Sequence, residues 1–137
     1  MAGTESVAFN RIGNSEIVLQ HFGYWPGFHD AEITKATFEA HSTGRSSVTF
    51  LIDAFEMTSE IDERGYYKLT KHCKIELQFI GIKEMEFDYF SHQNVIFELI
   101  LEEEKSSIKC TINSSVGLDA VVVAEEACIL SLTPMKQ

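Results

Sequence analysis

The sequence is poor in basic residues, with 11 Lys and Arg against 21 Asp and Glu, which gives a formal net charge of −10. This surplus would repel the phosphates of nucleic acids, so we do not expect the protein to bind DNA or RNA directly. An acidic surface can instead steer association with a basic protein, although a high net charge also simply keeps many proteins soluble.

Proline, cysteine and long apolar runs are also scarce. Two prolines and no repeat or low-complexity segment leave no internal boundary, so we expect a single β-rich domain over residues 1–137. The three cysteines are odd in number and widely spaced without a CxxC pair, which fits reduced thiols. The first ten residues lack the charged start and apolar run of a signal peptide, and no stretch is long enough to span a membrane. We therefore expect a cytoplasmic protein without a membrane partner.

The patterns that are present indicate β-structure. A short helix is expected over residues 16–22, with Asn14 and Ser15 as caps, Ile17, Val18 and Phe22 on one face, and Gly23 as its end. Beyond it, a period of two or an apolar run marks eight segments. These are 31–40, 48–55, 69–80, 84–90, 95–104, 108–113, 118–124 and 127–132. The prediction is a mainly β fold in which about seven strands form a single antiparallel sheet system, curled into a sandwich or half-barrel, with one short N-terminal helix.

Alternation also predicts which side chains face the core. In the segment 95–104 it places Phe97 and Leu99 on the buried face, and Ile96 and Ile100 on the face that should be wet. Together with Phe55, these two isoleucines suggest an exposed sheet surface that could bind another protein or a second copy of the chain.

The densest unusual segment is Tyr24-Trp25-Pro26-Gly27-Phe28-His29-Asp30-Ala31-Glu32. His29 with Asp30 or Glu32 could form half of a metal site or an acid–base pair. However, alternation would place Asp30 and Glu32 on the face opposite His29, and the sequence has no HxxxH, HExxH, GxSxG or phosphate-binding loop. The structural interpretation is stronger: Trp25 and Phe28 hold the helix against the sheet, and we predict no catalytic residues, metal or cofactor.

Two further polar features have open meanings. Ser91-His92-Gln93-Asn94 reads first as a turn, and nothing in its spacing requires it to meet the segment around His29. Carboxylates also recur in runs, which are usually solvated loops and strand ends. If the runs converge in the folded chain, they would form one negative patch that could bind a basic cleft, and nearby tyrosines could contribute binding energy. These runs are 56–63, 84–88, 98–104 and 125–126.

The order of these motifs resembles the immunity protein 50 family. The resemblance lies in Tyr24-Trp25-Pro26 followed by Phe28-His29-Asp30-Ala31-Glu32-Ile33, in His92-Gln93-Asn94-Val95-Ile96, and in a glycine-containing loop before a Ser-Leu-Thr-Pro ending. It implies a small β-rich partner of a bacterial polymorphic toxin, encoded beside the toxin and protecting the producing cell. The positions taken as candidate binding residues, which could also form a shared structural hub, are Tyr24, Trp25, Phe28, His29, Asp30, Glu32, His92, Gln93 and Asn94.

Three functional hypotheses follow from the sequence. The first is an immunity protein that neutralises a cognate toxin, such as a nuclease-type effector, by stoichiometric occlusion. The second is a metal-binding protein or small enzyme centred on His29, Asp30 and Glu32. The third is a generic β-sheet interaction module or homodimer.

Overall fold

The computed structural model describes residues 8–135, which form a mainly β fold, as predicted. No helix between Ala8 and Met135 has the length and apolar character needed to span a membrane. In chain order the elements are η1 (Phe9–Arg11), β1 (Ile12–Gly13), α2 (Ser15–Phe22), β2 (Glu32–Ala40), β3 (Ser46–Ile61), β4 (Tyr67–Asp88), β5 (Val95–Glu104), β6 (Ser107–Val116) and β7 (Asp119–Pro134).

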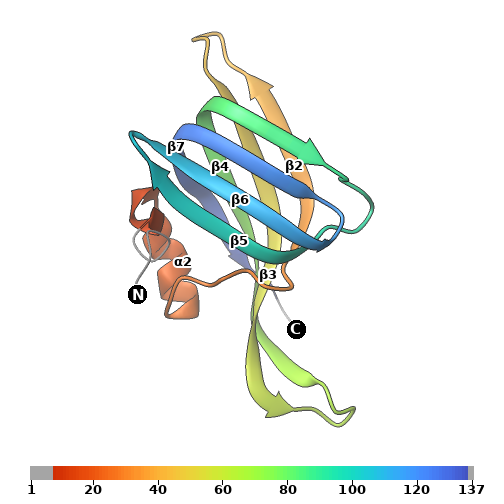
Figure 1. The fold of residues 1–137 in the computed structure, drawn as a ribbon. Coiled ribbons are helices and arrows are strands. Elements are labelled where there is room, and N and C mark those ends of the chain that lie inside the picture. The colour runs from red at the N-terminus through yellow and green to blue at the C-terminus, as the bar shows by residue number, and fades with distance from the viewer. Residues whose placement is uncertain (1–7, 136–137) are drawn as a thin grey trace.

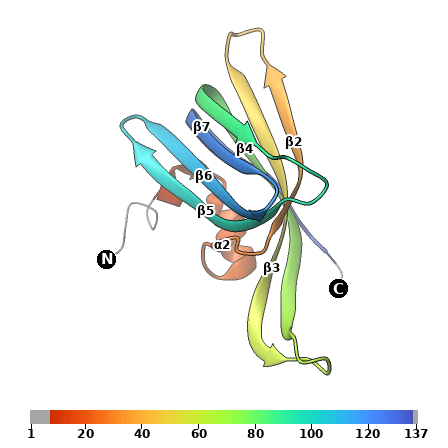
Figure 2. The same cartoon turned by 45° about the vertical axis from the view of Figure 1, so that its right-hand side comes forward.

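The seven described strands pair in the order β1-β7-β4-β3-β2-β5-β6, and β6 pairs again with β7. The sheet therefore curls round until its pairing closes in a ring, which is more complete than the half-barrel that the sequence suggested. In Figure 1, β5 and β6 cross in front of β3, and in Figure 2 they lie to the left of β2 and β3; α2 lies below β5 in both views. The pairing is antiparallel among the described strands except between β1 and β7, where Ile12 lies opposite Ala127.

Two long strands replace four predicted segments. The segments 69–80 and 84–90 join in β4, and the segments 118–124 and 127–132 join in β7. β4 passes from its pairing with β3, which ends at Ile80, to a stretch paired with β7 alone. Gly81, with φ +76°, lies at this change, and a register shift follows between Ile82 and Glu84. The sequence prediction separated each strand where its alternation breaks, whereas the chain continues through the irregularity.

The predicted facing of β5 is wrong at its start. Ile96 is buried, whereas Phe97 is 53% exposed. Register shifts on both sides of Ile96 explain the reversal, because an extra residue in one strand moves the following side chains to the other face. Leu99 and Leu101 return to the core as expected. Buried Ile96 therefore offers no surface for a second protein, and Ile100 and Phe55 are partly buried.

The helix α2 packs on the ring through Val18 and Phe22, whereas Ile17 is exposed and does not share their face as predicted. Asn14 occupies the N-cap position without a side-chain capping bond, and its amide instead donates to the Ile129 carbonyl oxygen at 3.2 Å. Gly23 ends the helix in the left-handed conformation and donates its N–H to Leu19, as expected of a C-terminal glycine.

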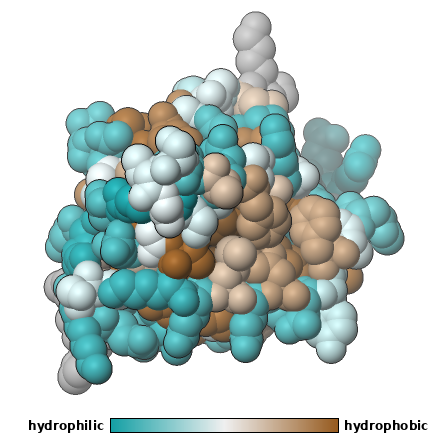
Figure 3. Space-filling model, turned by 90° about the horizontal axis from the view of Figure 1, so that it is seen from above, coloured by the Kyte–Doolittle hydropathy of each residue, from teal (hydrophilic) through white to brown (hydrophobic). Residues whose placement is uncertain are grey.

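Aromatic contacts fill the end of the ring beside the β2–β3 hairpin. Phe87 of β4 contacts Phe50 of β3 and Phe38 of β2, with ring centroids 5.7 and 5.2 Å apart. Seen from above, apolar side chains lie among polar ones on this face (Figure 3). These contacts connect parts of β2 and β4 that are not hydrogen-bonded to each other.

The ends of β3 and β4 leave the ring as a two-stranded arm, residues 55–70, which projects away from the ring (Figure 1, Figure 2). Its tip is a turn in which the Asp62 carboxylate accepts hydrogen bonds from the backbone N–H groups of Arg64 and Tyr66. Four large apolar or aromatic side chains on the arm are exposed to solvent: Met57, Ile61, Tyr66 and Tyr67.

Candidate functional site

The two polar segments singled out in the sequence meet where β2 approaches β5. Asp30 donates its N–H to Ile96, Ile96 donates to Ala31, and Ile33 donates to Asn94, at 2.8, 2.8 and 2.9 Å. We call this junction of residues 29–33 with residues 94–97 the seam. The seam completes the ring of strands. The spacing of the two segments in the sequence gave no reason to expect that they would meet.

Asn94 occupies the centre of the seam and is buried. Its Nδ2 donates to the carbonyl oxygens of Ile33 and Ser91, and its Oδ1 accepts from the N–H groups of Ser91 and Leu118, at 2.9 to 3.3 Å. One side chain therefore connects β2, the turn before β5 and the residue that precedes β7. His92 and Gln93, in contrast, are exposed on the turn.

Trp25 and Phe28 pack against other aromatic side chains. Trp25 stacks on Phe9 at 5.2 Å and meets Phe28 edge-on at 5.8 Å, and Phe28 is buried in the core. Tyr24 points elsewhere: its hydroxyl donates to the Glu56 carboxylate at 2.8 Å. Desolvation, and secondly this contact with Glu56, raise the pKa of the Tyr24 hydroxyl above its ordinary value. Tyr24 thus contacts the foot of the arm.

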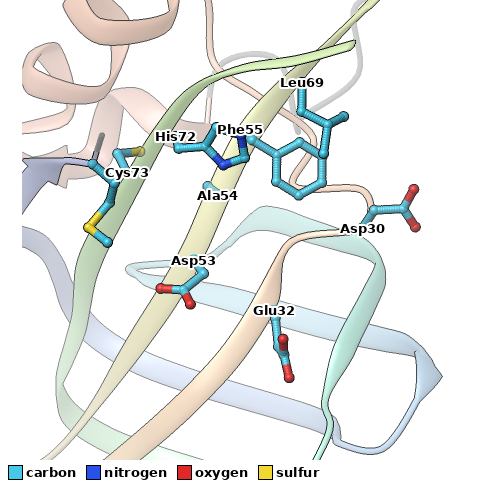
Figure 4. A pocket seen from close by; sticks show the side chains of 9 residues that line it. Asp30, Glu32, Asp53, Ala54, Phe55, Leu69, His72 and Cys73 are labelled. Atoms are coloured by element: carbon cyan, nitrogen blue, oxygen red, sulfur yellow. The ribbon is translucent and has the colours of Figure 1, made fainter. Parts of the chain in front are cut away.

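A cavity of about 350 Å³ opens at the foot of the arm (Figure 4). Phe55 and His72, from neighbouring strands, lie close together there, and Asp53, Glu32 and Asp30 lie along one side. Its lining combines carboxylates with apolar and aromatic groups: Asp30, Glu32, Asp53, Ala54, Phe55, Leu69, His72, Cys73 and Met135.

The carboxylates around the cavity differ in their partners. Asp53 accepts a hydrogen bond from the Lys74 ammonium at 2.7 Å. Asp30 lies 3.6 Å from Nε2 of His29, whose Nδ1 donates to the Phe97 carbonyl oxygen at 2.8 Å. Within residues 8–135, no side chain forms a hydrogen bond or an ion pair with the Glu32 carboxylate. Glu32 is therefore the carboxylate most available to a cationic group from outside.

The geometry does not favour metal or acid–base chemistry at His29, Asp30 and Glu32. Phe28 and Asp30 both have positive φ, so this segment is a turn in which the strand alternation assumed from the sequence does not apply. Asp30 and Glu32 line the cavity together, whereas the His29 ring contacts Phe97 at 5.5 Å. In the described part of the chain, no three His, Cys, Asp or Glu side chains are grouped so that they could hold a metal ion.

The three cysteines are free thiols, and Cys73 and Cys110 are buried in the core, whereas Cys128 is partly buried. Burial raises the pKa of Cys110 to about 12 and, with a smaller contribution from Asp53, that of Cys73 to about 11. Burial and the nearby Glu126 also raise the pKa of Cys128. At neutral pH these thiols carry their protons, which is unfavourable for a nucleophile.

A family model described as immunity protein 50 matches residues 14–135. The chain belongs to the immunity protein 50 family. No curated protein and no solved structure matches this immunity protein 50 chain significantly.

The motifs that carried the resemblance come together in this member of the immunity protein 50 family. The motif around Trp25 and His29 and the motif around Asn94 form the seam. Gly117, from the glycine-containing loop, lies against the seam. A Cβ added to Gly117 would lie 2.3 Å from the Gln93 carbonyl oxygen and 2.6 Å from Oδ1 of Asn94. The Ser-Leu-Thr-Pro ending pairs with β4, and the Met135 N–H that follows donates to the His72 carbonyl oxygen beside the cavity.

The acidic runs of this immunity protein 50 chain do not form one patch. Glu86 and Asp88 of β4 line a shallow groove with Asp119 and Asn113, and Asn113 donates to Glu98 of β5 at 3.0 Å. Two runs therefore share one face of the ring. The run 56–63 lies on the arm, and the run 125–126 is bound to Arg45, with N–O distances of 3.0 and 2.8 Å.

Several residues of the cavity were not identified from the sequence. Asp53, Leu69, His72 and Met135 come from three segments that meet only in the folded chain. Phe55, which the sequence marked as apolar on a face that should be wet, also lines the cavity. The alternation of β3 did indicate that Asp53 and Phe55 share a face. The pairing of Asp53 with Glu32 could not be predicted from the spacing of residues in the sequence, because it depends on the register between β2 and β3.

Proposed function

We propose that this member of the immunity protein 50 family neutralises a cognate bacterial toxin in the cytoplasm by binding it stoichiometrically, without turnover. The observation that carries the proposal is the arm, which presents unburied apolar side chains on a projecting element. Met57, Ile61, Tyr66 and Tyr67 are 47%, 60%, 69% and 55% exposed. Exposed apolar groups on a projecting element are typical of a protein-binding surface.

The physical chemistry of the arm suits a binding element. A two-stranded ribbon without further strands gains little stability from its own packing, so a partner that covers its apolar side chains would stabilise it. Tyr66 and Tyr67 are of the residue type that often carries binding energy, because a tyrosine buries a large ring at a low entropic cost.

The foot of the arm is already fixed in position. Glu56 accepts the Tyr24 hydrogen bond on one side, and its other carboxylate oxygen lies 3.5 Å from the Lys71 ammonium. Lys71 also donates to the Phe22 carbonyl oxygen at 3.0 Å, and its own carbonyl oxygen lies 2.8 Å from Nε2 of His21. Such preorganisation favours binding because less freedom is lost when the partner docks.

The charge of the protein supports a basic partner. A net charge of −10 and the acidic face that carries Glu86, Asp88 and Glu98 would attract a toxin with a positively charged cleft, such as a nuclease, and would raise the association rate more than the affinity.

Co-expression with the toxin encoded by the adjacent gene tests the proposal. We expect the protein to rescue cell growth and to co-purify with the toxin in a one-to-one complex. Replacing both arm tyrosines, Tyr66→Ser with Tyr67→Ser, is expected to weaken the complex by at least roughly tenfold. Tyr89→Ser is the matched control, because Tyr89 is an exposed tyrosine outside the arm.

The outcomes separate the hypotheses. Absence of both rescue and complex would refute toxin neutralisation. A concentration-dependent dimer that is abolished by the double arm substitution would instead assign the arm to self-association.

A further inference from the structure

We infer that the cavity at the foot of the arm is a socket for one arginine side chain of the partner protein. This inference rests on the proposed function, because it names the chemistry by which the toxin would be held. The cavity has a volume of about 350 Å³ and is lined by carboxylates from β2, β3 and the turn before β2, with an apolar and aromatic wall opposite them.

The charge of the rim selects a cation. Asp30, Glu32 and Asp53 line the cavity, and Lys74 compensates the charge of Asp53 at 2.7 Å. Nδ1 of His29 donates to the Phe97 carbonyl oxygen at 2.8 Å, and Nε2 lies 3.6 Å from Asp30. Asp30 and Glu32 therefore leave the rim negative, and an anionic or neutral occupant would not compensate them.

The wall opposite the rim favours a long side chain with a planar head. Phe55 and His72 lie with ring centroids 5.7 Å apart, and Leu69 and Met135 add apolar surface. An arginine can lay its aliphatic stem along such a wall, stack its guanidinium on an aromatic ring and donate two parallel hydrogen bonds to a carboxylate. Lysine offers the stem but neither the planar stacking nor the paired donors.

The cavity is continuous with the arm. Leu69, which lines the cavity, is the cross-strand partner of Met57, so these side chains lie side by side on one face of the arm. A partner segment that covers the exposed Met57 is thereby brought to the mouth of the cavity. The surface thus offers an apolar contact along the arm and a polar anchor at its foot.

Nuclear magnetic resonance with small probes tests the socket without requiring the toxin. We would titrate the full-length protein with N-acetyl-arginine amide, and separately with N-acetyl-citrulline amide, which has nearly the same shape without the charge. The expected result is a saturable change in the amide signals of Glu32, Phe55 and His72 with the arginine probe alone. Glu32→Gln is expected to weaken this binding several-fold, whereas Glu39→Gln, on the same strand but exposed away from the cavity, should not change it.

The same variants measured against the toxin separate the two proposals. Glu32→Gln is expected to weaken the toxin complex by roughly tenfold, through faster dissociation, whereas Glu39→Gln leaves it unchanged. A stable toxin complex that tolerates Glu32→Gln would overturn the socket while the proposed function stands. Specific arginine binding by a protein that forms no toxin complex would refute the proposed function, and with it the toxin as the source of the arginine. Arginine-induced changes spread equally over all carboxylates would also overturn the socket.

Discussion

Replacing Asn94 by alanine should weaken the fold by an amount that can be worked out from its contacts. The substitution removes the hydrogen-bond partner of the Leu118 N–H and a donor to the Ile33 carbonyl oxygen, and both residues are buried. An unsatisfied buried group costs about 1–3 kcal/mol, so the two together cost about 2–6 kcal/mol. The lost contacts to exposed Ser91 add less. A value of about 3 kcal/mol, in the lower half of this range, is already a large part of the roughly 5–15 kcal/mol that stabilises a typical domain.

Urea unfolding followed by circular dichroism measures this cost. For a slope of about 2 kcal/mol per M urea, a loss of about 3 kcal/mol lowers the midpoint by about 1.5 M. Asn113→Ala is the control, because Asn113 is exposed and makes one hydrogen bond to Glu98, so its loss should cost less than about 1 kcal/mol.

Asn94→Asp refines the test because it keeps the shape and removes only the donors. The new carboxylate still accepts from Ser91 and Leu118 but faces two carbonyl oxygens, so the variant should be less stable than the wild type at neutral pH. Protonation restores a donor, so the deficit should shrink as the pH falls. Equal stability of Asn94→Ala and Asn113→Ala would refute our account of the seam.

Three further predictions concern other parts of the molecule. Gly117→Ala places a methyl group against the seam at φ +85°, and we expect unfolding to become easier by about 2 kcal/mol or more, measured in the same urea assay. Replacing Glu84, Glu86 and Asp88 by lysine should lower the association rate of the toxin and the salt dependence of that rate, with little change in the dissociation rate. Surface plasmon resonance measures both rates, and an unchanged association rate would contradict electrostatic steering. Burial raises the pKa of Cys110 from 9.0 to about 12, so folding retains a proton that the unfolded chain releases, and the free energy of unfolding should fall as the pH rises from about 9 to 12. Cys110→Ala should make the free energy of unfolding less dependent on pH between about 9 and 12. An unaltered slope would refute the assignment of this pH dependence to the Cys110 thiol.

The fold class could be predicted because it depends on local patterns. The alternation in β3 and β6 reappears in the structure as buried Phe50, Ile52, Cys110 and Ile112. The same method failed at Ile96, where register shifts reverse the faces. A bulge depends on how two strands fit together, and that fit has no local signature in either strand.

The candidate site was predictable only in part, because it is built from distant segments. The unusual composition around Trp25 and His29 identified an important region, and Asp30 and Glu32 do line the cavity. The contacts that give Asn94 its role join it to Ile33 and Leu118, 61 and 24 positions away. Such contacts follow from the closure of the ring and not from the composition of either segment.

The hydrogen bond between Tyr24 and Glu56 joins the foot of the arm to the segment that leads into the seam. Tyr24 and the seam residue Asp30 belong to one short segment, so we expect movement of the arm foot to affect the place where the ring closes. A toxin that binds the arm would then raise the melting temperature of the whole domain. Because such linkage is reciprocal, a substitution that destabilises the seam would lower the affinity of the arm for the toxin.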